Sequence, residues 1–206
     1  MGAARRHGYP PKVQVQQEGS EQTMSTERSS VMDTTNTGTE EVRMNTNPSA
    51  YALGSEDGEA LWFFGTLIIF KATAEQTGGR FSLVEQLAPR GMATPLHVHR
   101  EDEESFYVLE GELTVYLEDS AHPTPVSAGE FVHIPGGVVH AFRVESETAR
   151  LLDLTTPQHE RFMRAAGEPA QERVIPPEGL IDMEKVEVAQ QQHGIEILGP
   201  PPGAQG

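Results

Sequence analysis

The sequence predicts an all-β sandwich or barrel, and two observations lead to this prediction. Short runs of Val, Ile, Leu, Phe and Tyr begin near Tyr51 and continue to about Leu154. Gly, Pro and acidic residues interrupt these runs at intervals of about 8–12 residues, which is typical of sandwiches and barrels. Helical patterns follow only after the last of these runs.

The apolar runs define nine expected strands in chain order. They are Ala60–Phe64, Leu67–Ala72, Phe81–Leu87, Ala93–Val98, Glu104–Leu109, Glu112–Leu117, Phe131–Ile134, Val138–Val144 and Arg150–Leu154. Turn signals separate them, among them Thr77-Gly78-Gly79, Pro89-Arg90-Gly91, Glu118-Asp119-Ser120, Ala128-Gly129 and Pro135-Gly136-Gly137. Such Gly, Pro and Asp clusters mark the places where a strand ends and the chain reverses.

Two short helices are expected after the strands. Thr156 fits an N-cap and Pro157 the first helical position, and Gly167 ends this helix. Asp182 fits the N-cap of a second helix, Met183–His193, which Gly194 ends.

The ends of the chain differ from the middle in composition. Residues 1–47 are rich in Gln, Ser, Thr, Glu and Asn and poor in large apolar side chains, so they are expected to be disordered. The predicted organisation is a tail over 1–47, a β-barrel domain over 48–157, and a C-terminal helical extension and tail over 158–206. Met32 and Met44, as well as Met1, are possible translation starts.

Charge and composition exclude several kinds of partner. The net charge of −16 disfavours nucleic acid and anionic membrane surfaces. The absence of Cys excludes disulfides, thiolate metal sites and cysteine nucleophiles. The longest apolar run, Leu61–Phe70, is too short to span a bilayer, and no apolar segment follows Arg5-Arg6 as in a signal peptide. A cytoplasmic location is therefore expected.

Four residues are candidates for a metal site: His97, His99, Glu104 and His140. The two histidines of His97-Val98-His99 project from one face of a strand, because side chains alternate with period 2. Three imidazoles and one carboxylate suit a divalent first-row transition metal that keeps open positions for substrate or dioxygen.

Glu104 joins the histidines only if the chain turns between them. His99 and Glu104 are five residues apart, and an odd separation on one strand points the two side chains to opposite faces. The polar segment Arg100–Glu103 is therefore expected to form a hairpin loop, with Glu104 opening the antiparallel neighbour of the histidine strand. Glu103 would be the ligand if this loop were one residue shorter. His140 lies in an otherwise apolar run, where an unpaired imidazole would be costly.

The other polar residues in and around these segments are not expected to take part in chemistry. Glu101 and Asp102 are assigned to a solvated loop. The remaining histidines show no comparable pattern, and they are His7, His122, His133, His159 and His193.

Residues 91–111 and 129–144 resemble the two motifs of the cupin superfamily. The first motif is matched at Gly91, His97, His99, Glu104 and Gly111, and the second at Gly129, Pro135, Gly137 and His140, with Val144 where the family has Asn. One motif pair implies a single-domain cupin, whose barrel is a double-stranded β-helix or jelly roll. Single-domain cupins generally pair through outer strands, so the resemblance also implies a homodimer.

Within the superfamily, the chain is similar to microbial quercetin 2,3-dioxygenase-like proteins. The likeness implies one bound Fe, Mn, Ni, Co, Cu or Zn ion held by His97, His99, Glu104 and His140. It also implies that Glu104 accepts the proton of a flavonol hydroxyl before dioxygen cleaves the ring with release of carbon monoxide. Burial in an apolar barrel is expected to raise the pKa of Glu104 for that role. Phe81, Phe106 and Phe142 are the expected walls of the substrate pocket.

Three classes of function remain open from the sequence. The first is a metal-dependent dioxygenase acting on a flavonol or a related enol-bearing aromatic. The second is another metal-cupin enzyme, such as an isomerase, decarboxylase or cyclase, and the third is a non-catalytic binding module.

Overall fold

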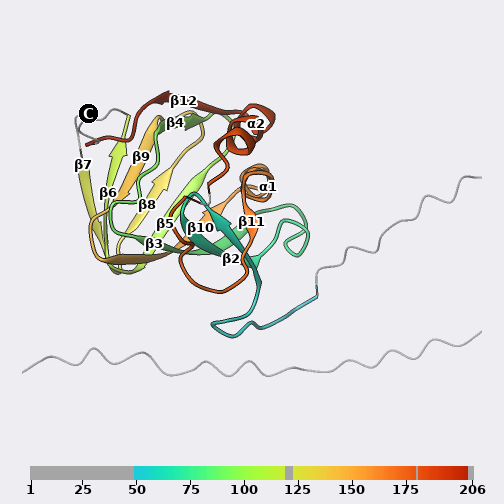
Figure 1. Cartoon of the computed structure of the whole chain (residues 1–206). Helices are drawn as coiled ribbons and strands as arrows, with labels where there is room; N and C mark the ends of the chain where they lie inside the picture. Colours follow the sequence, from blue (N-terminus) through green and yellow to red (C-terminus); the bar gives the residue numbers. More distant parts are fainter. Residues whose placement is uncertain (1–48, 119–122, 180, 204–206) are drawn as a thin grey trace, which may run out of the picture. The chain divides into compact units, whose positions relative to one another are not determined.

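The computed structural model describes residues 49–118, 123–179 and 181–203, and in this part of the chain two antiparallel sheets face each other (Figure 1). The first sheet has the order β11-β1-β2-β3-β10-β5-β8. Its strands are Glu168–Pro169 (β11), Glu59–Phe63 (β1), Thr66–Ala72 (β2), Ser82–Pro89 (β3), Thr148–Thr155 (β10), Glu104–Glu110 (β5) and Phe131–Ile134 (β8). The second sheet has the order β12-β4-β9-β6-β7. Its strands are Ile195–Gly199 (β12), Leu96–His99 (β4), His140–Val144 (β9), Glu112–Leu117 (β6) and Pro123–Ser127 (β7).

The all-β prediction is confirmed, and each of the nine expected strands is present, with ends that agree with the prediction or differ from it by at most three residues. Alternation of buried and exposed side chains explains why these segments form strands with one inward face. Along β3, the even-numbered residues from Ser82 to Ala88 are buried while the residues between them are partly exposed. The expectation of disorder for residues 1–47 lies outside the described residues.

Three strands were not predicted, and each lacks a strong strand signal. β7 has two prolines within five residues, which is tolerated because β7 lies at the edge of its sheet. β11 is only two residues long. β12 follows the second helix directly and pairs with β4, so that Ile195 lies opposite His99 and Ile197 opposite His97.

The expected hairpin between the histidine strand and Glu104 is wrong. β4 pairs with β9 and β12, whereas β5 pairs with β10 and β8 in the other sheet. The loop from Arg100 to Glu103 therefore crosses between the sheets. The odd spacing from His99 to Glu104 is no obstacle, because the two side chains approach each other from opposing sheets.

The main apolar core fills the space between the two sheets at one end. It includes Phe106, Val108 and Leu151 from the first sheet and Leu113 and Val115 from the second, all at most 1% exposed. Burial of such side chains contributes about 1.5–3 kcal/mol each. The histidine cluster lies beyond this core.

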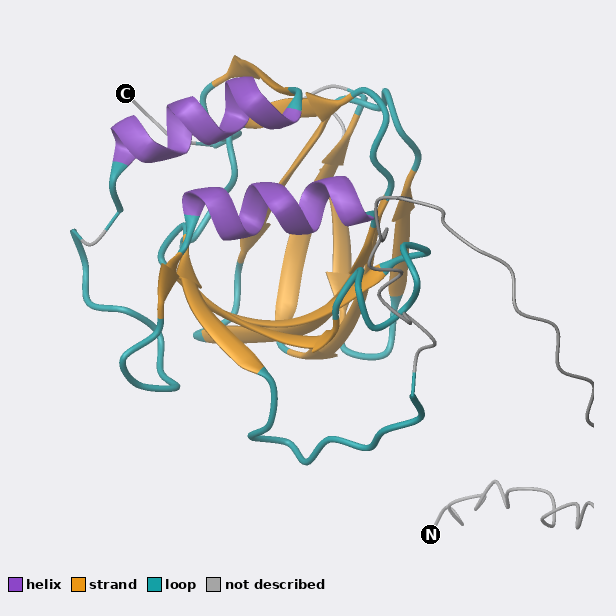
Figure 2. Ribbon diagram, turned by 90° about the vertical axis from the view of Figure 1, so that its right-hand side faces the viewer, coloured by secondary structure: helices purple, strands orange, loops and turns teal. Residues whose placement is uncertain are grey.

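Two helices cover the other end of the barrel, and both agree with the prediction. Helix α1 (Pro157–Ala166) begins after the N-cap Thr156 and ends at Gly167. Helix α2 (Met183–His193) begins after the N-cap Asp182 and ends at Gly194, whose φ of 72° suits glycine. Figure 2 shows α1 lying across the space between the sheets, with α2 beside it. Neither helix in the described ranges is long and apolar enough to cross a membrane.

Candidate metal centre

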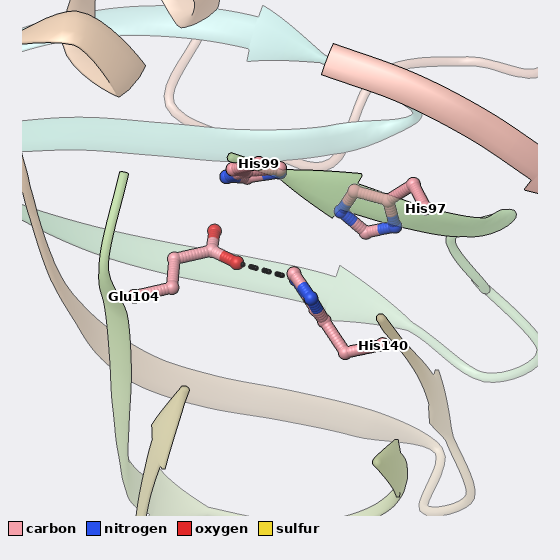
Figure 3. Close-up of side chains that lie close together, drawn as sticks. All are labelled: His97, His99, Glu104 and His140. Atoms are coloured by element: carbon pink, nitrogen blue, oxygen red, sulfur yellow. Dashed lines mark hydrogen bonds and ion pairs between the residues drawn. The ribbon is translucent and has the colours of Figure 1, made fainter. Parts of the chain in front are cut away.

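The structure brings together all four residues that the sequence selected (Figure 3). His97 and His99 come from β4, His140 begins β9, and Glu104 begins β5 in the facing sheet. One potential ligand atom from each residue lies within 4.8 Å of those of the other three. All four side chains belong to residues less than 9% exposed.

Hydrogen bonds to the backbone fix the orientation of two of the imidazoles. The Nδ1 atom of His97 is 2.8 Å from the carbonyl oxygen of Pro95, and Nδ1 of His140 is 3.0 Å from that of Val138. A carbonyl oxygen only accepts hydrogen bonds, so each Nδ1 must carry a proton. The Nε2 atoms, which carry lone pairs in the neutral rings, are then the atoms available to a metal ion.

The polar atoms facing one another fit a bound cation. Nε2 of His140 is 3.0 Å from Oε2 of Glu104. With the proton on Nδ1, this contact sets a lone pair against a carboxylate unless His140 carries two protons or a cation lies between them. Both ring nitrogens of His99 are buried without a hydrogen-bond partner among the described residues. In the neutral ring one of these nitrogens carries a lone pair, which is costly to bury unpaired and which a metal ion would satisfy.

Burial keeps His97 and His99 neutral. Burial, together with the neighbouring His140, lowers the pKa of His97 from 6.5 to about 4. Burial likewise lowers the pKa of His99 to about 2, with His159 adding to the effect. Metal ions bind the neutral imidazole, so these two ligands do not have to lose a proton near neutral pH.

The pKa of Glu104 differs from the expectation. Burial alone raises it, as anticipated, but the neighbouring imidazoles of His159 and His140 outweigh burial and hold the pKa well below its usual range. Glu104 is therefore an ionised carboxylate, which suits a metal ligand. The adjacent carboxyl of Asp153 behaves in the opposite way, because burial and the negative charge of Glu104 raise its pKa well above the usual range.

Sequence reasoning missed the part taken by His159, which was expected to have no role. His159 lies on α1 and is 4% exposed, with Nε2 at 3.1 Å from Oε1 of Glu104. Its ring stacks on that of His99 at a centroid distance of 4.5 Å. The only sequence signal is that His159 and Phe162, one helical turn apart, share the buried face of α1.

The assignment of Asp102 to a solvated loop is also wrong. Asp102 is 6% exposed, and its side chain accepts a hydrogen bond from the hydroxyl of Thr156. Thr156 is the N-cap of α1, so this contact ties the loop before Glu104 to the start of the helix that carries His159.

A largely apolar cavity of about 50 Å³ is lined by three of the four residues, His97, His99 and Glu104. Phe106 and Phe142 line it, as expected, and their rings meet edge to face at 5.4 Å. Phe81 does not line it and is 38% exposed, which corrects the expectation for this residue. The reason is its phase: Phe81 directly precedes Ser82, which begins the inward-facing set of β3, so its side chain points outward.

Fold and site together define a jelly-roll barrel with three histidines and a glutamate at one end. Residues 83–155 match the family described as the cupin domain, and both motifs of the site lie within this range. This part of the chain is therefore similar to a cupin domain.

Similar proteins include an enzyme with a known reaction. Quercetin 2,3-dioxygenase of Bacillus subtilis (strain 168) is 30% identical over 127 residues, an alignment that covers 61% of this chain and 37% of that enzyme. The chain thus spans little more than a third of the length of this curated relative.

Among solved structures, the polyketide cyclase RemF of Streptomyces resistomycificus has 23% identity and a TM-score of 0.47, covering 70% of this chain and 96% of that one. A predicted oxalate decarboxylase of Thermotoga maritima has 18% identity and a TM-score of 0.41, covering 44% and 79%.

Proposed function

We propose that the chain is a metal-dependent dioxygenase that cleaves a flavonol or a related enol-bearing aromatic. The observation that supports this most is the buried set of three imidazoles and one carboxylate beside an apolar cavity, in a chain similar to a quercetin 2,3-dioxygenase. His97 and His140 would hold the ion through Nε2, and His99 would hold it through either ring nitrogen. Glu104 would hold it through a carboxylate oxygen. When bound, a divalent metal ion supplies a Lewis acid that favours the deprotonated form of a substrate hydroxyl.

Glu104 would accept the substrate proton. It is ionised, because neighbouring imidazoles lower its pKa, and it lines the cavity. A carboxylate with a low pKa is a weak base, so this transfer requires a hydroxyl whose own acidity is raised in the site. Cleavage of the substrate ring by dioxygen also benefits from exclusion of water. The aromatic rings of Phe106 and Phe142 provide an apolar wall of the cavity.

The space at the site limits how a substrate enters. A single water needs about 10–15 Å³, so the inner cavity of about 50 Å³ holds only a few groups of the size of water. A second cavity of about 520 Å³ shares Phe63, Phe64 and Met92 as walls with the first. We propose that the enol-bearing part of the substrate occupies the inner cavity and that the rest extends toward the outer one, past these three side chains.

Oxygen uptake by the metal-loaded protein tests the proposal. Protein loaded separately with Fe, Mn, Co, Ni, Cu or Zn should consume dioxygen and release carbon monoxide when a flavonol such as quercetin is added. Glu104→Gln should lose turnover while retaining measurable metal, and His133→Gln, which changes a histidine outside the cavity, should retain turnover. Metal binding without oxygen uptake over a panel of flavonols and related enols would favour another metal-cupin enzyme. Absence of metal binding would favour a non-catalytic module.

The homodimer implied by the resemblance also remains a proposal. Light scattering after size-exclusion chromatography tests it, and a mass of one chain would exclude it under the conditions used.

A further inference from the structure

His159 contacts Glu104, and no sequence motif predicts this contact. Its Nε2 is 3.1 Å from Oε1 of Glu104, while the other oxygen of that carboxylate, Oε2, is 3.0 Å from Nε2 of His140. The two oxygens of Glu104 are thus directed to different partners, one toward His159 of helix α1 and one toward His140 of β9.

The environment of Nδ1 distinguishes His159 from the metal-ligand candidates. In His97 and His140, Nδ1 lies 2.8 Å and 3.0 Å from a backbone carbonyl, so the proton is on Nδ1 and the lone pair is on Nε2. In His159, Nδ1 is buried and has no hydrogen-bond partner among the described residues. The neutral ring is therefore best satisfied with its proton on Nε2, where it donates to Glu104.

Helix α1 is held firmly enough to fix this donor. Glu160, the residue next to His159, accepts a hydrogen bond from the backbone amide of Ala74 at 2.6 Å and from the hydroxyl of Ser82. Glu160 also pairs with Arg164 at 2.8 Å. The ring of His159 itself is confined between His99, on which it stacks, and Phe162 at a centroid distance of 5.7 Å.

We propose that His159 is a positioning residue that donates its Nε2 proton to Oε1 of Glu104 and so presents Oε2 to the metal ion. The proposal rests on the metal site of the proposed function. It makes α1, which lies outside both sequence motifs, part of that site. Groups that orient a ligand in this way typically change metal affinity by about 10–100-fold when they are removed.

Metal affinity of three variants tests the role. His159→Leu removes the donor, whereas His159→Gln keeps an amide N–H group near the position of Nε2. His133→Gln serves as the matched control, because His133 lies on β8 and its ring is hydrogen-bonded to Ser105 instead. Cobalt(II) is the probe, since its dissociation constant is measurable by competition with a chelator and its visible absorption reports on the ligand arrangement.

His159→Leu should bind cobalt about 10–100-fold more weakly than the unaltered protein and should show an altered absorption spectrum. His159→Gln should recover most of the affinity, and His133→Gln should not differ from the unaltered protein. Unchanged affinity and spectrum in His159→Leu would overturn the proposal. It would also be overturned if Leu and Gln at position 159 were equally harmful, which indicates packing alone.

A second measurement separates this proposal from the proposed function. If the unaltered protein binds neither cobalt nor any of the other five metals, the proposed function fails, and nitrogen NMR of the metal-free protein then decides the role of His159. A proton on Nε2 of His159 that shifts in Glu104→Gln would support the contact. A proton on Nδ1, or no response to Glu104→Gln, would refute it.

Discussion

Acidification should destabilise the metal-free protein through His97 and His99. Burial lowers the pKa of His97 from 6.5 to about 4 and that of His99 to about 2. In the unfolded chain both return to about 6.5, so between pH 6.5 and 4 the unfolded chain binds more protons than the folded one. The stability that depends on these two neutral rings is therefore fully present above pH 6.5 and is lost as the pH falls.

The expected loss of unfolding free energy follows from how far the pH lies below the ordinary pKa of histidine. At pH 5 each ring is about 1.5 pH units below that value in the unfolded chain and still neutral in the folded one. At 1.36 kcal/mol per unit, the two rings together remove about 4 kcal/mol relative to pH 7.5. This is a large share of a typical unfolding free energy of about 5–15 kcal/mol.

Urea denaturation with a chelator present, at pH 7.5 and pH 5, measures the effect. Asp153 acts in the opposite direction, because its raised pKa makes the folded protein bind more protons than the unfolded chain. The histidine contribution is therefore the difference between the unaltered protein and the double variant His97→Gln/His99→Gln, since Asp153 is present in both. Equal losses of stability in the two proteins between pH 7.5 and pH 5 would refute the reasoning.

Three further predictions concern the stability of the fold. Gly111→Ala should destabilise the protein by about 1–3 kcal/mol more than Gly129→Ala in urea denaturation. Both glycines have a positive φ, 86° and 89°, but an added Cβ would collide with a neighbour, the backbone of Thr148, only at Gly111. Equal losses of unfolding free energy in the two variants would contradict this prediction. Asp182→Ala should lower the unfolding free energy by about 1 kcal/mol by removing the N-cap of α2, and an unchanged melting temperature would exclude that role. Glu118 has a φ of 67° in an exposed turn, a conformation that Asn adopts more readily than Glu, so Glu118→Asn should stabilise the protein by about 0.5–1 kcal/mol. Calorimetry that shows no rise in melting temperature would contradict this prediction.

Local sequence patterns predicted the strands and helices because their signals are short-range. Alternation marked β3, and Thr156, Gly167, Asp182 and Gly194 marked the ends of both helices. β12 was missed because its identity as a strand depends on pairing with β4, which lies about 100 residues earlier in the chain.

The sequence by itself determined which four side chains form the candidate metal centre. The spacing of His97, His99, Glu104 and His140 around fixed turns is a local property, and each residue belongs to a strand that its own neighbours define. Only the tertiary structure decided how these strands face one another. Glu104 reaches the histidines from the facing sheet and not from a neighbouring strand of the same hairpin.

Tertiary packing also decided the electrostatics of the site. Helix α1 docks over the barrel through Glu160 and Thr156 and thereby inserts His159 beside Glu104. Proximity of that imidazole and of His140 lowers a pKa that burial alone would raise, so the sign of the shift follows from which charges converge in space. Linear spacing carries no information about such convergence, because the interaction depends on distance in the folded chain.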